Sequence, residues 1–105
     1  MLDLNVLEFS QKIAEPGVVI LDVRTPDEIA EGFIEGALII DFQGSNFESE
    51  IASLNKDVTY AVYCRSGNRS GKAIKIMKGG GFHNLFNLDG GILDWVQAGM
   101  PLTEK

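Results

Sequence analysis

The sequence predicts an α/β fold, an open and mainly parallel sheet of about five strands flanked by helices. Short, continuous apolar runs recur along the chain, which is typical of strands covered on both faces. Segments with helical start and stop signals lie between these runs, and such alternation requires crossover connections and therefore parallel strands. With 105 residues, we expect one domain spanning residues 1–105.

The chain begins with a predicted helix and a predicted strand. Asn5 and Glu8 have the spacing of a capping box, so we expect a short helix that starts there and ends near Pro16-Gly17. Residues 18–21 follow as a continuous apolar run, which predicts the first strand.

The next three elements also have local signals. A second capping box begins at Thr25, where Pro26 takes the first helical position, and Gly32 ends this helix. Residues 37–40 are a second apolar run of strand type. Residues 47–54 have apolar side chains at helical spacing and are predicted as a helix.

The remaining elements continue the alternation. Residues 58–63 are rich in β-branched and aromatic side chains and give the clearest strand of the chain. Residues 72–78 are predicted as a helix that ends at Gly79-Gly80-Gly81. Residues 85–88 form a further short strand, and Asp89-Gly90-Gly91 turns into a last helix.

The charge of the chain narrows the range of partners. A formal net charge of −6 argues against a nucleic-acid binder, which normally carries a surplus of basic residues. The segment from Cys64 to Lys78 nevertheless contains five basic residues and no acidic one, namely Arg65, Arg69, Lys72, Lys75 and Lys78. This stretch is suited to a small anion, although the three lysines could equally form a solvated helix face. No apolar run approaches the roughly 20 residues that span a bilayer, so we expect no membrane contact.

Cys64 is the only cysteine of the chain. A single cysteine excludes an internal disulfide, a Cys-x-x-Cys redox pair and a cysteine-cluster metal site. With one histidine besides, we expect neither a metal nor a cofactor. A lone thiol is typical of a reducing compartment, so the expected location is the cytoplasm. We further expect a monomer.

The position of Cys64 indicates a reactive thiol. It follows the best predicted strand, and sites in parallel sheets form where the strands end. Unpaired amides at a following helix start would lower its pKa, as would the charges of Arg65 and Arg69. Ser66, Gly67 and Asn68 suit a tight turn whose amides bind an anion. The alternative is a small buried hydrophobic residue, but the loop that follows favours a nucleophile.

Three motifs of the chain resemble the rhodanese family of sulfurtransferases. The segment from Cys64 to Ser70, Cys-Arg-Ser-Gly-Asn-Arg-Ser, resembles the active-site loop of the family. Residues 21–37 resemble its N-terminal signature, and residues 89–95, Asp-Gly-Gly-Ile-Leu-Asp-Trp, resemble its C-terminal one. The three occur in order over residues 20–99. In one departure, Phe33-Ile34-Glu35 stands where the family often has His-Ile-Pro, for which we expect altered packing or partner contacts.

The resemblance implies a rhodanese-like fold and a thiosulfate sulfurtransferase activity. Cys64 would take sulfane sulfur from a small anionic donor such as thiosulfate. The resulting persulfide would pass it to a thiophilic acceptor, namely cyanide, a small thiol or a protein. Catalysis is thus assigned to Cys64, and substrate binding to the following loop residues: Arg65, Ser66, Gly67, Asn68 and Arg69.

Two other functions stay open at this point. Rhodanese-like folds also carry cysteine-dependent phosphatase and arsenate reductase chemistry, but that chemistry needs five residues between the cysteine and the arginine. Here four residues separate Cys64 from Arg69, which is better suited to a sulfur atom than to a tetrahedral phosphate. A non-catalytic binding module is the other alternative. The intact segment from Cys64 to Ser70, the thiol loop, disfavours it.

Five further residues of chemical interest are expected to be mainly structural. Asp22 and Arg24 follow the first strand and should form a polar network that fixes neighbouring loops, with an acid or anion-binding role as the alternative. His83 is predicted as a surface or turn residue, and Trp95 as part of the core. Tyr63 could also line the pocket beside Cys64.

Overall fold

A computed structural model describes residues 2–104, within which the chain forms a five-stranded sheet and five helices. The elements are, in chain order, β1 (Leu2–Leu4), α1 (Val6–Ile13), β2 (Val19–Asp22), α2 (Pro26–Ile29), β3 (Leu38–Ile39), α3 (Phe47–Ala52), β4 (Tyr60–Tyr63), α4 (Asn68–Gly79), β5 (Leu85–Leu88) and α5 (Gly91–Gln97). The strand order is β1-β5-β4-β2-β3, and every pairing is parallel. The predicted α/β class and parallel sheet are confirmed.

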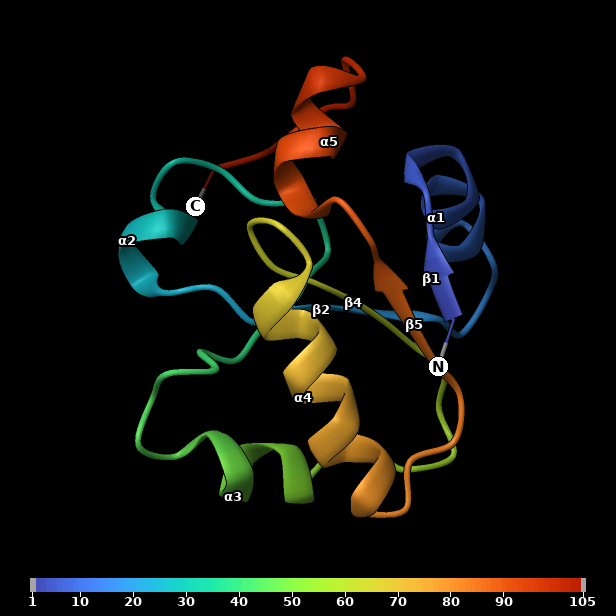
Figure 1. The fold of residues 1–105 in the computed structure, drawn as a ribbon, viewed down its shortest axis with the longest axis vertical. Coiled ribbons are helices and arrows are strands. Elements are labelled where there is room, and N and C mark those ends of the chain that lie inside the picture. Colours follow the sequence, from blue (N-terminus) through green and yellow to red (C-terminus); the bar gives the residue numbers. More distant parts are fainter. Residues whose placement is uncertain (1, 105) are drawn as a thin grey trace.

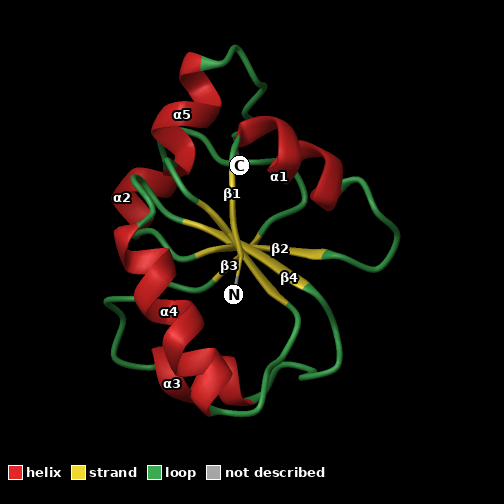
Figure 2. Cartoon of the chain, turned by 45° about the vertical axis from the view of Figure 1, so that its right-hand side comes forward, coloured by secondary structure: helices red, strands yellow, loops and turns green. Residues whose placement is uncertain are grey.

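Helices cover both faces of this sheet. Helices α1 and α5 lie on one side, and α3 and α4 lie on the other (Figure 1). Figure 2 shows the strands between these two layers of helices. None of the helices within residues 2–104 is long and apolar enough to span a membrane.

The side chains of β4 alternate between two separate cores. Tyr60, Val62 and the following Cys64 pack with α3 and α4, whereas Ala61 and Tyr63 pack with α1 and α5. All five residues are buried because β4 lies at the centre of the sheet, with covered faces above and below. Cys64 therefore belongs to the α3–α4 side of the molecule.

Both predicted capping boxes are present. The Asn5 side chain accepts a hydrogen bond from the Glu8 amide, and the Glu8 carboxylate accepts one from the Asn5 amide. Thr25 and Glu28 make the same reciprocal pair at the start of α2. These local signals fix the N-terminal ends of the first two helices.

Two elements differ from the sequence-based expectation. Residues 2–4 were assigned to no element, yet they form β1, an edge strand that pairs with β5. Helix α4 begins at Asn68, four residues before the predicted start at Lys72. The residues after Cys64 have the composition of a turn, but only Gly67 is left-handed, with φ of 96°, and the helix follows it directly.

Candidate active site

Cys64 lies where β4 ends, between the strand and the first turn of α4. The residue is 1% exposed, so its sulfur sits beneath the loop that leads to Asn68. The side chain packs in the same cluster as Ala73 and Ile74 of α4. The thiol is thus held by buried structure on one side and by a short backbone turn on the other.

Hydrogen bonds from the loop and from the first turn of α4 point at the sulfur. The Gly67 amide donates to Cys64 Sγ over 3.1 Å, and the Ser70 hydroxyl donates over 3.4 Å. Burial is the largest single influence and raises the pKa of Cys64. The Ser70 hydroxyl and the amides of Ser70, Ser66 and Gly67 outweigh it, so that the pKa is lowered. The pKa of Cys64 is therefore lowered, as expected, and hydrogen bonds from Ser70, Ser66 and Gly67 are the main cause.

Backbone contacts from the start of α5 stabilise the conformation of the thiol loop. The Ile92 amide donates to the Cys64 carbonyl over 2.9 Å, and the Leu93 amide donates to the Arg65 carbonyl over 3.2 Å. A Cβ on Gly67 would lie 2.0 Å from the Asp89 carbonyl oxygen, and one on Gly91 would lie 2.3 Å from the Arg65 carbonyl oxygen. Both positions therefore require glycine, and the Asp89-Gly90-Gly91 turn supports the thiol loop.

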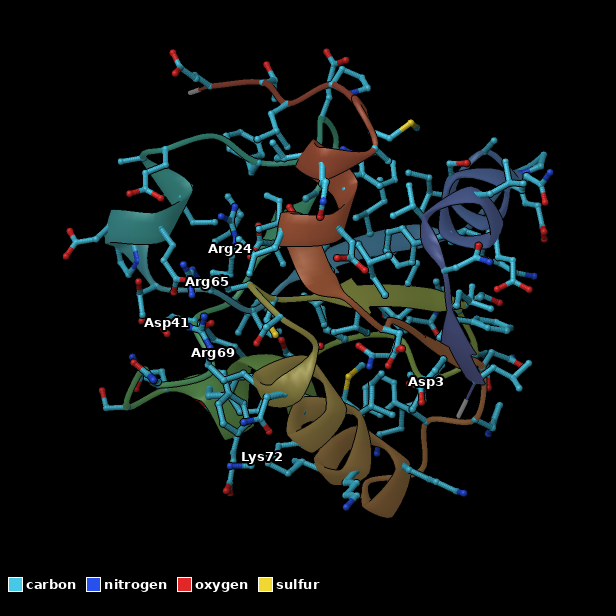
Figure 3. The ribbon with its side chains drawn as sticks, turned by 45° about the horizontal axis from the view of Figure 1, so that its top comes forward. Asp3, Arg24, Asp41, Arg65, Arg69 and Lys72 are labelled. Atoms are coloured by element: carbon cyan, nitrogen blue, oxygen red, sulfur yellow. The ribbon has the colours of Figure 1, made fainter. Side chains whose placement is uncertain are left out.

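The two arginines of the loop have different surroundings. The Arg69 guanidinium donates to both carboxylate oxygens of Glu28, each over 2.7 Å. This contact with Arg69 lowers the pKa of Glu28 to about 2. Arg65 is exposed and forms no ion pair with any residue of the described range 2–104. Figure 3 shows Arg65 between Arg24 and Arg69.

Asp22 and Arg24 form the polar network that was expected of them. The Arg24 guanidinium donates to both oxygens of the Asp22 carboxylate, over 2.8 to 3.1 Å, and both side chains are buried. The same guanidinium donates to the backbone carbonyls of Glu28 and Gly32. The pair therefore ties the end of β2 to the C-terminal part of α2 and to the turn that follows it, which is a structural role.

A groove of about 420 Å³ opens between α2 and α5, next to the thiol loop. Its lining residues are Arg24, Glu28, Glu31, Gly32, Arg65, Ile92, Leu93, Val96, Gln97 and Leu102. Arg65 is the member of the thiol loop that reaches the groove. Cys64 itself does not line it.

Of the three remaining predictions, the structure contradicts the one for Tyr63 and confirms those for His83 and Trp95. Tyr63 does not line a pocket beside Cys64, because it points to the opposite face of the sheet, where it is fully buried against Phe9. Its hydroxyl accepts a hydrogen bond from the Ile34 amide over 3.0 Å. His83 is exposed and Trp95 is buried in the core, as predicted.

The Phe33-Ile34-Glu35 segment contributes to packing. Phe33 and Ile34 are buried, and Phe33 forms an antiparallel bridge with Thr103. The segment thereby anchors the residues that follow α5. Leu102, next to this bridge, forms part of the groove wall.

Two residues of the site were not identified from the sequence. Ser70 is fully buried and donates to the sulfur, and its signal was a serine in a stripe otherwise made of Ala73, Ile74 and Met77. Glu28 was identified only as a helix-capping residue, and nothing local in the sequence indicates its contact with Arg69.

Comparison with known proteins gives one consistent result. A sequence family described as the rhodanese-like domain matches residues 5–98. A sulfurtransferase from Allochromatium vinosum is 36% identical over 102 residues, which cover 96% of this chain and 94% of that protein. A tRNA uridine(34) hydroxylase from Acaryochloris marina is 32% identical over 86% of this chain, but the match spans only 30% of that protein. The crystal structure of a rhodanese-related protein from Thermoplasma volcanium superposes with a TM-score of 0.88 at 30% identity, and each chain is covered completely.

Proposed function

This chain belongs to the rhodanese-like domain family, and we propose that it is a sulfurtransferase that carries sulfane sulfur as a persulfide on Cys64. The observation that carries the proposal is the position of Cys64 Sγ beneath the Gly67 amide and the Ser70 hydroxyl. These donors favour the thiolate, which is the form of cysteine that attacks sulfur.

In the first half-reaction the donor is a small anion such as thiosulfate. The Cys64 thiolate attacks the outer sulfur of thiosulfate and forms a new S–S bond. The S–S bond of the donor breaks, and its electron pair leaves on sulfite. The amides of Ser66 and Gly67 hydrogen-bond to Cys64 Sγ, and we assign them to stabilising negative charge on the outer sulfur of the persulfide.

In the second half-reaction a nucleophilic acceptor removes that sulfur. The acceptor, namely cyanide, a thiol or a protein thiol, attacks the outer sulfur of the persulfide. The bond between the two sulfurs breaks, and Cys64 is released as a thiolate. Because the two substrates react in turn at one atom, we expect ping-pong kinetics.

The arginines of the loop are assigned to charge stabilisation. The ion pair with Glu28 raises the pKa of Arg69, and the charge of Cys64 adds to this effect. We therefore assign the Arg69 charge to stabilising the Cys64 thiolate. Arg65 is exposed at the entrance to the loop and is the better placed of the two to attract an incoming anion.

Intact-mass measurement after thiosulfate treatment, without reductant, tests the proposal. We expect a species heavier by one sulfur atom, which cyanide removes and which Cys64→Ser does not form. A wild-type protein that stays at its original mass at neutral pH would refute the persulfide. The same would follow if Cys64→Ser gained the sulfur.

A further inference from the structure

We propose that the groove between α2 and α5 binds the sulfur acceptor, an extended peptide segment that presents a cysteine beside an apolar and a cationic side chain. This inference rests on the proposed function, because an acceptor is needed only once Cys64 carries a persulfide. It adds the chemical class of the acceptor and the surface that recognises it.

The groove is continuous with the thiol loop through two residues. Arg65 directly follows Cys64 and also lines the groove. Glu28 holds Arg69 of the loop and lines the groove from the α2 side. A chain lying in the groove therefore has one end beside the loop that contains the sulfur.

One wall of the groove is apolar and partly exposed. Ile92, Leu93 and Val96 of α5 form this wall together with Leu102. Leu93 is 46% exposed and Val96 is 52% exposed, and the two lie one helical turn apart. Apolar side chains gathered in this way mark a binding surface when they line a hollow.

The charges of the groove specify the polar part of its occupant. Arg24 and Glu28 already have partners, Asp22 and Arg69. Within residues 2–104, Arg65 and Glu31 line the groove without an ion-pair partner. Arg65, within the thiol loop, can attract the attacking thiolate of the acceptor. Glu31, on the α2 side of the groove, can form an ion pair with a cationic side chain of the acceptor.

The depth of the sulfur favours an extended segment over a folded surface. Cys64 is 1% exposed, so an acceptor thiol has to reach below the surface of the loop, which a projecting segment does more readily than a flat folded surface. Cyanide occupies only a small part of about 420 Å³, whereas a few residues of an extended chain fill it. The transfer itself needs no further reagent: the peptide thiolate attacks the outer sulfur, the Cys64 bond to it breaks, and a peptide persulfide and the Cys64 thiolate result.

The experiment compares blocked peptides as acceptors for protein already loaded with sulfur. The reference peptide contains one cysteine, one leucine and one lysine. One variant peptide replaces leucine with serine, and another replaces lysine with glutamate. The rate of sulfur loss from Cys64, read by quenched mass spectrometry, is divided by the rate with cyanide for the same protein.

We expect the serine peptide to react about tenfold more slowly, because a half-buried leucine is lost from the groove. The glutamate peptide should react about three- to fivefold more slowly at low ionic strength. With Glu31→Lys the order of the lysine and glutamate peptides should reverse. Val96→Glu should abolish the preference for leucine.

Ile76→Glu is the matched control, because Ile76 is a β-branched helical residue that is 40% exposed on α4 and does not line the groove. It should keep all peptide preferences. Equal rates for the three peptides, or an unchanged order in Glu31→Lys, would overturn the groove while leaving the persulfide intact. Failure of Cys64 to load at all would overturn the proposed function instead.

Discussion

Two arginine–carboxylate pairs lie at the same edge of the sheet and differ mainly in burial. The side chains of Asp22 and Arg24 are 0% and 3% exposed, whereas those of Glu28 and Arg69 are 21% and 20% exposed. In each pair the guanidinium contacts both carboxylate oxygens. The chemistry of the two pairs is thus the same, but their access to water is not.

Because of this difference in burial, we expect the two pairs to have different roles. Breaking a buried pair leaves a charge that water cannot reach, so the stability of the fold depends on the Asp22–Arg24 pair. In the Glu28–Arg69 pair, either side chain can contact water or a substrate instead of the other, at a small cost in free energy. The first pair holds the loops around the site. We expect the second pair to set how much positive charge the thiol loop presents to a substrate.

The largest expected effect is on folding. Asp22→Asn should lower the free energy of unfolding by about 3–5 kcal/mol, because the Arg24 guanidinium stays buried without its counter-charge. Urea unfolding measures this loss. Glu28→Gln is the matched variant and should cost about 1 kcal/mol or less. Equal losses in the two variants would remove the distinction drawn from burial.

The second largest expected effect is on the rate of sulfur loading. Arg69→Ala should slow sulfur loading from thiosulfate roughly tenfold while leaving the protein folded, because a charge near the sulfur is lost. Lys72→Ala serves as the control, since Lys72 is exposed on the same helix and forms no ion pair with a described residue. The loading rate is followed by mass. If both variants load at the wild-type rate, Arg69 has no part in the reaction.

The smallest effect is a dependence of stability on pH. The pKa of Glu28 is about 2 in the folded protein, against an ordinary value of 4.5. A lowered carboxyl pKa contributes stability above pH 4.5 that is lost as the pH falls toward 2. A shift of this size corresponds to about 3 kcal/mol, but water screens the partly exposed pair and reduces its contribution. We therefore expect a stability difference of about 1 kcal/mol between wild type and Glu28→Gln, which shrinks over this pH range. A difference that persists at pH 2 would show that Glu28 acts through its neutral contacts alone.

Sequence reasoning located the thiol because its signals are local. The strand before Cys64, the turn after it and the basic residues near it are all contiguous in the chain. The capping boxes at Asn5 and Thr25 were predicted for the same reason, since each involves residues three positions apart. Contacts of this kind leave a readable spacing in the sequence.

Features that depend on distant residues were missed. Glu28 reaches Arg69 across 41 positions, so its second role has no local pattern. Strand β1 has only three residues, and its position is fixed by pairing with β5 near the other end of the described range. Tyr63 was misjudged because alternation places it on the face of β4 opposite Cys64, and sequence proximity hides that separation.

The dependence of the thiol loop on α5 has a consequence for biosynthesis. The Ile92 amide and the Gly91 backbone lie against the carbonyls of Cys64 and Arg65, so the loop acquires its shape from residues translated well after it. A nascent chain that has emerged only as far as α4 lacks this support. If Cys64 has the proposed function, we expect it to react with sulfur donors only after α5 docks, because the contacts that shape its loop form at that stage.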